Sequence, residues 1–334
     1  DHNSLSLIAD QFLKRLLTIN ETCYQCDGPL PIVMLRPAIC DRPLCNHQFE
    51  ECGLGFSLEE EICHRPEICD LLISMCAAAS KSDRLSVFFP KALQDLRSGK
   101  MLSTSLQDIS RIGNILDLCP RITSLAEFAA TGTLDAELRE RNPLLPCLLR
   151  WIITSNRSHI RALASSETFS QVLAGHQFVL MTSSPEKEAR FQSYVREARK
   201  QSSNAFEYAF HGSGKGNWHS ILRQGLLNMS GTQHQLHGAA YGSGVYMAPD
   251  LCTSLAYSKM SGGSGWKNSM FGETWQALAL CELANTSRLR KPNPYWVVPE
   301  ADTIVTRYLF LFTETEIALQ RNVMASSINV PFRQ

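Results

Sequence analysis

The stretch from Phe206 to Tyr257 constrains this chain most, because short strands and helices alternate within it and each is bounded by glycine or a capping residue. The alternating aromatic residues of FEYAF predict a strand that ends at His211. We expect Asn217 to cap the helix WHSILRQ, which ends at Gly225. The first half of the stretch thus reads as a strand followed by a helix.

The second half repeats this order. Gly242-Ser243-Gly244 predicts a turn into the strand VYMA, and Asp250 opens a helix that carries Ser254 and Tyr257. Aromatic faces stack on a planar heterocycle, and backbone groups beside a glycine can pair with a carboxamide. A serine hydroxyl completes that pairing, and an imidazole binds ribose hydroxyls. This chemistry favours a nicotinamide-containing ligand without singling it out.

Three motifs in the stretch resemble the catalytic domain of the poly(ADP-ribose) polymerase-like, diphtheria-toxin-type ADP-ribosyltransferases. They are H-G-S-x-x-x-N (His211, Gly212, Ser213, Asn217), G-x-G-V-Y (Gly242, Gly244, Tyr246) and S-x-x-Y (Ser254, Tyr257). A lone His-Gly pair is a weak signal, but nine positions at matching spacing are a strong one. The chain looks most like the sixth and eighth members of the family, through Trp151–Ile160, His176–Phe191 and Gln235–Gly242.

The resemblance implies an NAD site without a catalytic metal. NAD would be the substrate, split at the nicotinamide ribose so that ADP-ribose passes to an acceptor protein, the chain itself included. The matched residues take these roles: His211, Ser213 and Asn217 hold ribose hydroxyls on the adenosine side, Gly212 and Ser254 pair with the carboxamide, Tyr257 stacks on nicotinamide, and Tyr246 covers its other side.

Elongating members of the family place a glutamate at a third catalytic position, and here the alignment puts Tyr295 there, beside His211 and Tyr246. Glu300 lies five residues further on. A tyrosine cannot replace a carboxylate that polarises an attacking hydroxyl. We therefore expect a mono-ADP-ribosyltransferase; the alternatives are a polymer-forming enzyme and an inactive module that binds NAD or ADP-ribose.

Glu314-Thr-Glu316 invites comparison with the E-x-E motif of the cholera-toxin-type transferases. Those enzymes also need an arginine on the first strand, where this chain has His211. We interpret the two glutamates as a solvated strand end.

Two close cysteine pairs near the N-terminus predict a structural zinc site formed by Cys23, Cys26, Cys40 and Cys45. His47 or Cys52 is an alternative for one ligand. Free thiols or disulfides remain possible readings, although they explain the paired spacing less well. A zinc module of this kind can also serve as a scaffold that recruits the acceptor protein.

The expected architecture is α+β, with two packed antiparallel sheets of the ADP-ribosyltransferase fold following a mainly helical, zinc-stabilised region. We place the boundary between domains 1–140 and 141–334. Helices are expected at 4–18, at 58–80 with a break near Pro66, from Asn142 to Thr154, and from Pro185. Strands are expected at His176–Met181, Trp275–Leu283, Tyr295–Val298 and Ile304–Phe312.

Composition limits the partners. Lys plus Arg equal Asp plus Glu, at 32 each, so no global charge marks the chain for nucleic acid or an anionic membrane. No apolar run is long enough to span a bilayer.

Cysteines such as Cys76 and Cys281 lie in apolar surroundings that suit buried thiols, so we expect an intracellular, cytoplasmic or nuclear location. Because the chain begins at Asp1, we expect it to belong to a longer protein.

Overall fold

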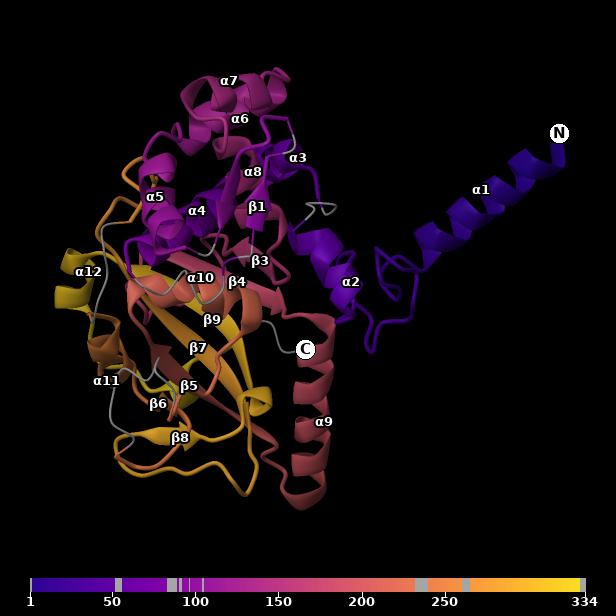
Figure 1. Ribbon diagram of the computed structural model, residues 1–334. Coiled ribbons are helices and arrows are strands. Elements are labelled where there is room, and N and C mark those ends of the chain that lie inside the picture. The colour runs from indigo at the N-terminus through magenta and orange to yellow at the C-terminus, as the bar shows by residue number, and fades with distance from the viewer. Residues whose placement is uncertain are drawn as a thin grey trace.

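The computed structural model describes residues 2–51, 56–82, 89, 92–95, 97–103, 105–231, 240–259 and 265–330. Cys52 and most of the segment Gln235–Gly242 lie outside these ranges. Within them the chain forms one five-stranded and two two-stranded antiparallel sheets together with many helices (Figure 1). The expected α+β class is confirmed.

The part of the chain before residue 155 is mainly helical, and the expected helices at its start, around Pro66 and before Thr154 are confirmed. Its elements are α1 (His2–Leu17), α2 (Pro43–Asn46), the π-helical turn η1 (His47–Glu51), α3 (Leu58–His64), α4 (Pro66–Ser80), β1 (Ala92–Gln94), β2 (Met101–Ser103), α5 (Leu106–Leu116), α6 (Ile122–Ala130), α7 (Leu134–Arg141) and α8 (Leu145–Thr154).

The strands follow, and the order in the large sheet is β3-β4-β9-β7-β5. The elements are β3 (His159–Ala162), β4 (His176–Thr182), α9 (Pro185–Gln201), β5 (Phe206–Gly212), η3 (Lys215–Asn217), α10 (Trp218–Gln224), β6 (Val245–Met247), α11 (Leu251–Ala256), η4 (Tyr257–Lys259), β7 (Gln276–Ala284), β8 (Trp296–Val298), η5 (Ala301–Thr303), β9 (Ile304–Phe312), α12 (Glu314–Leu319) and η6 (Ala325–Ser327). All strands expected from the sequence are confirmed to within one residue; β3 and the hairpin β1–β2 were not expected.

The central strand β9 explains why the sheet is packed on both faces. Every residue from Ile304 to Phe312 is buried, as a run of β-branched and aromatic side chains favours. Leu309 and Leu311 belong to one hydrophobic cluster, whereas Tyr308 and Phe310 belong to another. Because side chains alternate along a strand, β9 divides the core into two layers.

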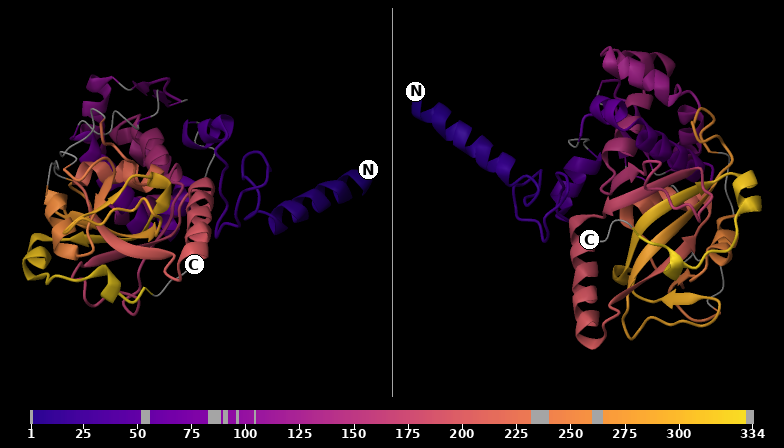
Figure 2. Two further views of the ribbon diagram at one scale, coloured as in Figure 1. Left: turned by 90° about the horizontal axis from the view of Figure 1, so that it is seen from below. Right: turned by 180° about the vertical axis from the view of Figure 1, so that it is seen from behind.

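The larger cluster extends from Leu58 in α3 to Leu311 in β9, so the helical part and the sheet share one hydrophobic core. Figure 1 shows α4, α5 and α8 over one end of the large sheet and the β6–β8 pair at the opposite end. Helix α9 packs against β7, β9 and η5. Helix α1 projects away from the rest of the described chain in Figure 1 and in both views of Figure 2. None of the described helices has the length and hydropathy that a bilayer crossing needs.

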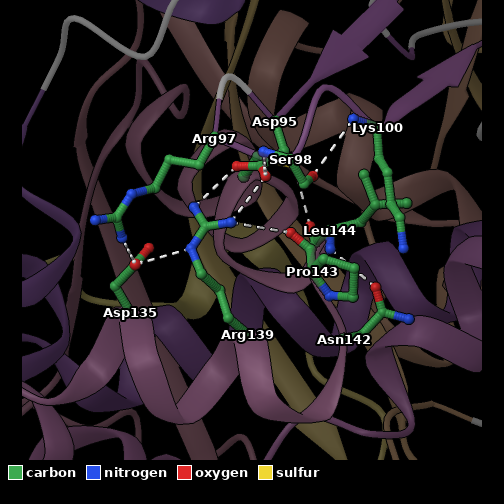
Figure 3. A network of polar contacts seen from close by, with 10 residues as sticks. Asp95, Arg97, Ser98, Lys100, Asp135, Arg139, Asn142, Pro143 and Leu144 are labelled. Carbon is green, nitrogen blue, oxygen red and sulfur yellow. Dashed lines mark hydrogen bonds and ion pairs between the residues drawn. The ribbon is translucent and has the colours of Figure 1, made fainter.

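A buried ion pair fastens the unexpected hairpin to the helices that follow it (Figure 3). The Arg139 guanidinium in α7 donates to both carboxylate oxygens of Asp95, at 2.8 and 2.9 Å, and to Asp135 at 2.8 Å. Ser98 N also donates to Asp95, at 2.8 Å. The Arg139 side chain therefore holds the pKa of the Asp95 carboxyl well below its usual range.

We predict that Asp95→Ala lowers the free energy of unfolding by about 3 kcal/mol, because it leaves the Arg139 charge poorly compensated. Asp135→Ala, which removes a more exposed partner, should cost about 1 kcal/mol or less. The folded-state pKa of Asp95 is lowered, so its contribution is present at neutral pH and declines as the pH falls below about 4. Urea unfolding of the three proteins at several pH values measures this; equal stability of the two variants at pH 7 would contradict it.

Candidate functional site

His211 lies near the end of β5 and faces β6. Its Nδ1 is 2.9 Å from the backbone oxygen of Tyr246. A carbonyl oxygen can only accept, so Nδ1 carries the proton and Nε2 presents a lone pair. Burial lowers the pKa of His211, which keeps the ring neutral at physiological pH. A neutral imidazole with a bare Nε2 can accept a hydrogen bond from a hydroxyl group.

Gly212 brings β5 into contact with α11. A Cβ atom at this position would lie 1.7 Å from the backbone oxygen of Ser254, so no other residue fits without moving the helix. Ser254 is buried, and its Oγ donates to the backbone oxygen of Phe210 at 2.8 Å. The remaining lone pairs of Ser254 Oγ can accept an amide N–H. This is the polar contact that a carboxamide next to Gly212 requires.

Three tyrosines predicted from separate motifs meet in the structure. Tyr257 at the C-terminal end of α11 donates through Oη to Tyr295 Oη at 2.8 Å. The Tyr295 ring centroid lies 6.0 Å from that of Tyr257 and 6.2 Å from that of Tyr246. Burial and the hydrogen bond from Tyr257 to Tyr295 raise the pKa of Tyr257 to about 12. The three side chains therefore form an aromatic wall, in which the Tyr257 hydroxyl stays protonated at physiological pH.

Ser213 and Asn217 lie close together in the loop after β5. Asn217 Nδ2 donates to Ser213 Oγ at 2.9 Å, and Trp218 Nε1 donates to Ser213 O at 3.0 Å. The expectation that Asn217 caps α10 was right in position and wrong in mechanism, because its side chain makes no capping bond. Its amide instead orients the Ser213 hydroxyl. Asp250, by contrast, caps α11 as expected, by accepting from Thr253 N at 2.9 Å.

Two residues at the site were missed from the sequence. Tyr241 is 42% exposed, its ring centroid lies 5.7 Å from that of Tyr295, and its backbone N donates to Tyr246 Oη. Its place directly before Gly242 was a signal that could have been used. Arg290 was not foreseeable, because a bridge between Arg290 and Val297 brings it to the turn, where Nη2 donates to the backbone oxygen of residue 243 at 2.7 Å.

The other carboxylates considered from the sequence lie outside the group of three tyrosines, and Glu300 and Glu316 have partners of their own. Glu300 forms an ion pair with Arg288. Glu314 and Glu316 do not lie at a strand end: they begin α12, where Thr313 Oγ1 accepts from Glu316 N and the Glu316 carboxylate accepts from Thr313 N. That reading of the E-x-E pattern was therefore wrong in its secondary structure, since T-x-x-E is a capping box.

The four predicted metal ligands come together. The sulfur atoms of Cys23, Cys26, Cys40 and Cys45 all lie within 4.8 Å of one another. Cys26 Sγ and Cys40 Sγ are 3.8 Å apart. Zinc bonded to sulfur at about 2.3 Å has sulfur–sulfur edges of roughly 3.8 Å in a tetrahedral site. The donor set and its size therefore fit a zinc ion.

The surroundings favour a thiolate at one position of this four-cysteine cluster, Cys23, whereas burial raises the pKa values of Cys40 and Cys45. Burial by itself would raise the pKa of Cys23, but backbone N–H groups, that of Cys40 first among them, bring it to about 7. Arg42 Nη1 lies 3.5 Å from Cys26 Sγ. The alternative ligand His47 is not part of the cluster. Elsewhere, Cys76 and Cys281 are buried thiols as expected, and burial raises the pKa of Cys281 to about 12.

Comparison with known proteins gives a consistent result. Residues 178–312 match the family model described as poly(ADP-ribose) polymerase catalytic domain. The chain is 34% identical to protein mono-ADP-ribosyltransferase PARP8 of Homo sapiens over 91% of its own length and 38% of that relative, and equally similar to PARP8 of Mus musculus. Mouse protein mono-ADP-ribosyltransferase PARP16 is 38% identical over 23% of the chain and 21% of the relative. The chain thus spans about two fifths of the length of the PARP8 relatives. The resemblance to the eighth member is confirmed; that to the sixth stays a prediction.

We predict that His211 is a neutral imidazole protonated at Nδ1, because only a donor can contact the Tyr246 carbonyl. Nitrogen-15 NMR of the folded protein should show this tautomer from neutral pH down to below about 6.5, the ordinary pKa of histidine. The same spectra of Trp218→Phe identify ring signals that change for reasons of local packing alone. Protonation at Nε2, or titration of His211 above pH 6.5, would contradict the prediction.

Proposed function

We infer, from the membership of residues 178–312 in the poly(ADP-ribose) polymerase catalytic-domain family, that this chain transfers ADP-ribose from NAD to acceptor proteins, with release of nicotinamide. We assign it single-unit transfer, so that it is a protein mono-ADP-ribosyltransferase. The observation that carries this assignment is the contact of Tyr295 with Tyr246 and Tyr257, beside His211 and without a carboxylate among them.

Binding of NAD would use groups whose geometry is described above. His211 Nε2 accepts from a ribose hydroxyl on the adenosine side, and Ser213 with Asn217 adds polar partners. The backbone of Gly212 and the hydroxyl of Ser254 pair with the carboxamide. Tyr257 stacks on the nicotinamide ring, and Tyr246 covers its other side. These contacts hold both halves of the dinucleotide in one orientation.

The reaction breaks the bond between nicotinamide and its ribose, and charge develops on the ribose as an oxocarbenium-like centre. A side chain of the acceptor attacks the ribose carbon that was bonded to nicotinamide, and nicotinamide leaves. The chain contributes mainly by orientation and by polar groups fixed before the reaction begins. Tyr246 is held for this purpose at its hydroxyl, which accepts from Tyr241 N and donates to the Gly242 carbonyl at 3.0 Å.

Elongation makes a different demand, because a ribose hydroxyl of bound ADP-ribose must then become the nucleophile. A carboxylate suits the polarisation of that hydroxyl. Tyr295 presents a phenol instead of a carboxylate, and its Oη already accepts from Tyr257. The Glu300 carboxylate forms an ion pair with Arg288. The third catalytic position therefore supports transfer but not chain growth.

We predict that labelled NAD yields single ADP-ribose units on the chain or an acceptor, seen as a compact band on a denaturing gel. Tyr257→Ala should lower kcat/KM for NAD about tenfold through loss of stacking, and His211→Ala should lower it as well. Tyr194→Ala, in α9 and outside the contacts proposed for NAD, is the matched control and should transfer normally.

Two results would contradict this assignment. A ladder that a polymer-degrading glycohydrolase collapses would show elongation and return attention to Glu300. Tight binding of ADP-ribose without any transfer would instead identify an inactive binding module.

We propose that the four-cysteine cluster holds structural zinc and that residues 1–140 and 141–334 are the two domains. The cluster is fastened to the later part of the chain, because the Arg157 guanidinium donates to Ile39 O at 3.1 Å, to Asp41 at 3.0 Å and to Glu186 at 3.2 Å. We further propose that the N-terminal module recruits the acceptor protein. Buried thiols outside the cluster support an intracellular location, cytoplasmic or nuclear.

We predict one zinc ion per chain, which Cys26→Ser should remove. Structural zinc supplies about 10–16 kcal/mol of apparent binding free energy, comparable to the stability of a domain. Hydrogen exchange should therefore rise across residues 20–51 on chelation while β5 and β7 stay protected. Cys63→Ser, at an exposed cysteine outside the cluster, is the control and should keep its zinc. Metal analysis that finds no zinc in the reduced wild-type protein would refute the site.

A further inference from the structure

A buried carboxylate in the helical part of the chain has a role that neither the proposed NAD contacts nor the zinc site explains. Asp70 in α4 is fully buried, and no ion pair joins it to a basic side chain within the described ranges. Burial raises its pKa, against the effect of its hydrogen bonds. A carboxylate in such a place is costly unless several donors surround it. The groups that donate hydrogen bonds to Asp70 therefore indicate its role.

Most of those donors come from a distant loop, residues 265–275, which we call the 265–275 loop. Ser269 Oγ donates to Asp70 Oδ1 at 2.5 Å, and Met270 N donates to Oδ2 at 2.9 Å. Ser74 Oγ, on the same helix, completes the set at 3.1 Å. Asp70 thus binds the loop by two hydrogen bonds to its tip.

Other contacts attach the same loop to the helical part. Asn268 Nδ2 donates to the backbone oxygen of Cys119 at 2.6 Å, and Lys81 Nζ donates to that of Gly265 at 3.1 Å. Gly265 N closes the base of the loop by donating to Glu273 O at 3.2 Å. The loop is therefore a compact unit, and the helical part holds it through Asp70, Lys81 and Cys119.

This loop connects directly with the nicotinamide side of the proposed site. It precedes β7, and at the start of that strand Gln276 Oε1 accepts from Ser258 Oγ at 2.7 Å. Ser258 is the neighbour of Tyr257 in η4. A displacement of the loop would therefore be transmitted through Gln276 and Ser258 to the ring that stacks on nicotinamide.

We propose that Asp70 is a positioning residue: by holding the tip of the 265–275 loop, it fixes Tyr257 for nicotinamide binding. The inference rests on the proposed NAD site. The path through Gln276 and Ser258 ends at Tyr257, whereas the loop meets the adenosine side only indirectly, through Lys215 Nζ, which donates to Glu273 O at 2.6 Å two residues from Asn217. Loss of Asp70 therefore weakens binding of nicotinamide more than binding of ADP-ribose, which His211 holds from the adenosine side. A role in stability alone would affect both ligands equally.

The test compares Kd values for nicotinamide and for ADP-ribose in the full chain. Asp70→Leu, which keeps the volume and removes both acceptors, should weaken nicotinamide binding about two- to tenfold, the range expected for one aromatic stacking contact. ADP-ribose affinity should stay within about twofold of wild type. Asp70→Asn should restore nicotinamide binding, because its carbonyl can accept from Met270 N while its amide donates to the serine hydroxyls, which can rotate.

Two further variants keep the outcome clear. Ser269→Ala removes one loop contact from a partly exposed position, so it reports on the loop even where Asp70→Leu fails to fold. Asp95→Leu removes another buried carboxylate of the helical part, one that binds Arg139 rather than the 265–275 loop, and it should lower stability without changing the ratio of the two Kd values.

The outcomes separate this inference from the proposed function. Selective loss of nicotinamide affinity in Ser269→Ala or Asp70→Leu supports the inference. Equal loss of both ligands, or no loss in either folded variant, overturns it and leaves the NAD site intact. Failure of the wild-type protein to bind either ligand overturns the proposed function, and this inference with it.

Discussion

The arrangement of the candidate site depends on one close approach, that of Gly212 to the backbone of Ser254. Because Gly212 has no side chain, α11 lies directly against the end of β5, and the bond from Ser254 Oγ to Phe210 O fixes the distance. Tyr257 at the end of α11 then reaches Tyr295, which directly precedes β8 of the small sheet. A side chain at residue 212 would separate the histidine from the tyrosines.

Much of this could be predicted because the information is local. The strand FEYAF, the capping Asp250 and the turn of Gly242 with Gly244 are each encoded by a few neighbouring residues, and their elements are confirmed. The cysteine pairs are equally local, and their four sulfur atoms meet as expected. Asn217 shows the limit of such reasoning: its position at the helix start was predicted, but the nearby Ser213 hydroxyl competes for its side chain.

What could not be predicted depends on contacts between distant segments. Arg290 reaches the turn at Gly242 only through strand pairing, and Asp70 meets Ser269 across about 200 positions of sequence. Hydropathy also gave no indication that the core runs without interruption from Leu58 to Leu311. The helical part is therefore packed against the sheet, and the domain boundary near residue 140 stays a prediction.

The central claim is that the tyrosine-lined site binds NAD in one defined orientation. A crystal structure of the chain with a non-hydrolysable NAD analogue tests it most directly. The account predicts the nicotinamide ring on Tyr257, its carboxamide between Gly212 and Ser254, and an adenosine-side ribose hydroxyl on His211 Nε2. An analogue bound elsewhere, or bound with its nicotinamide ring away from Tyr257 and Tyr246, would contradict it.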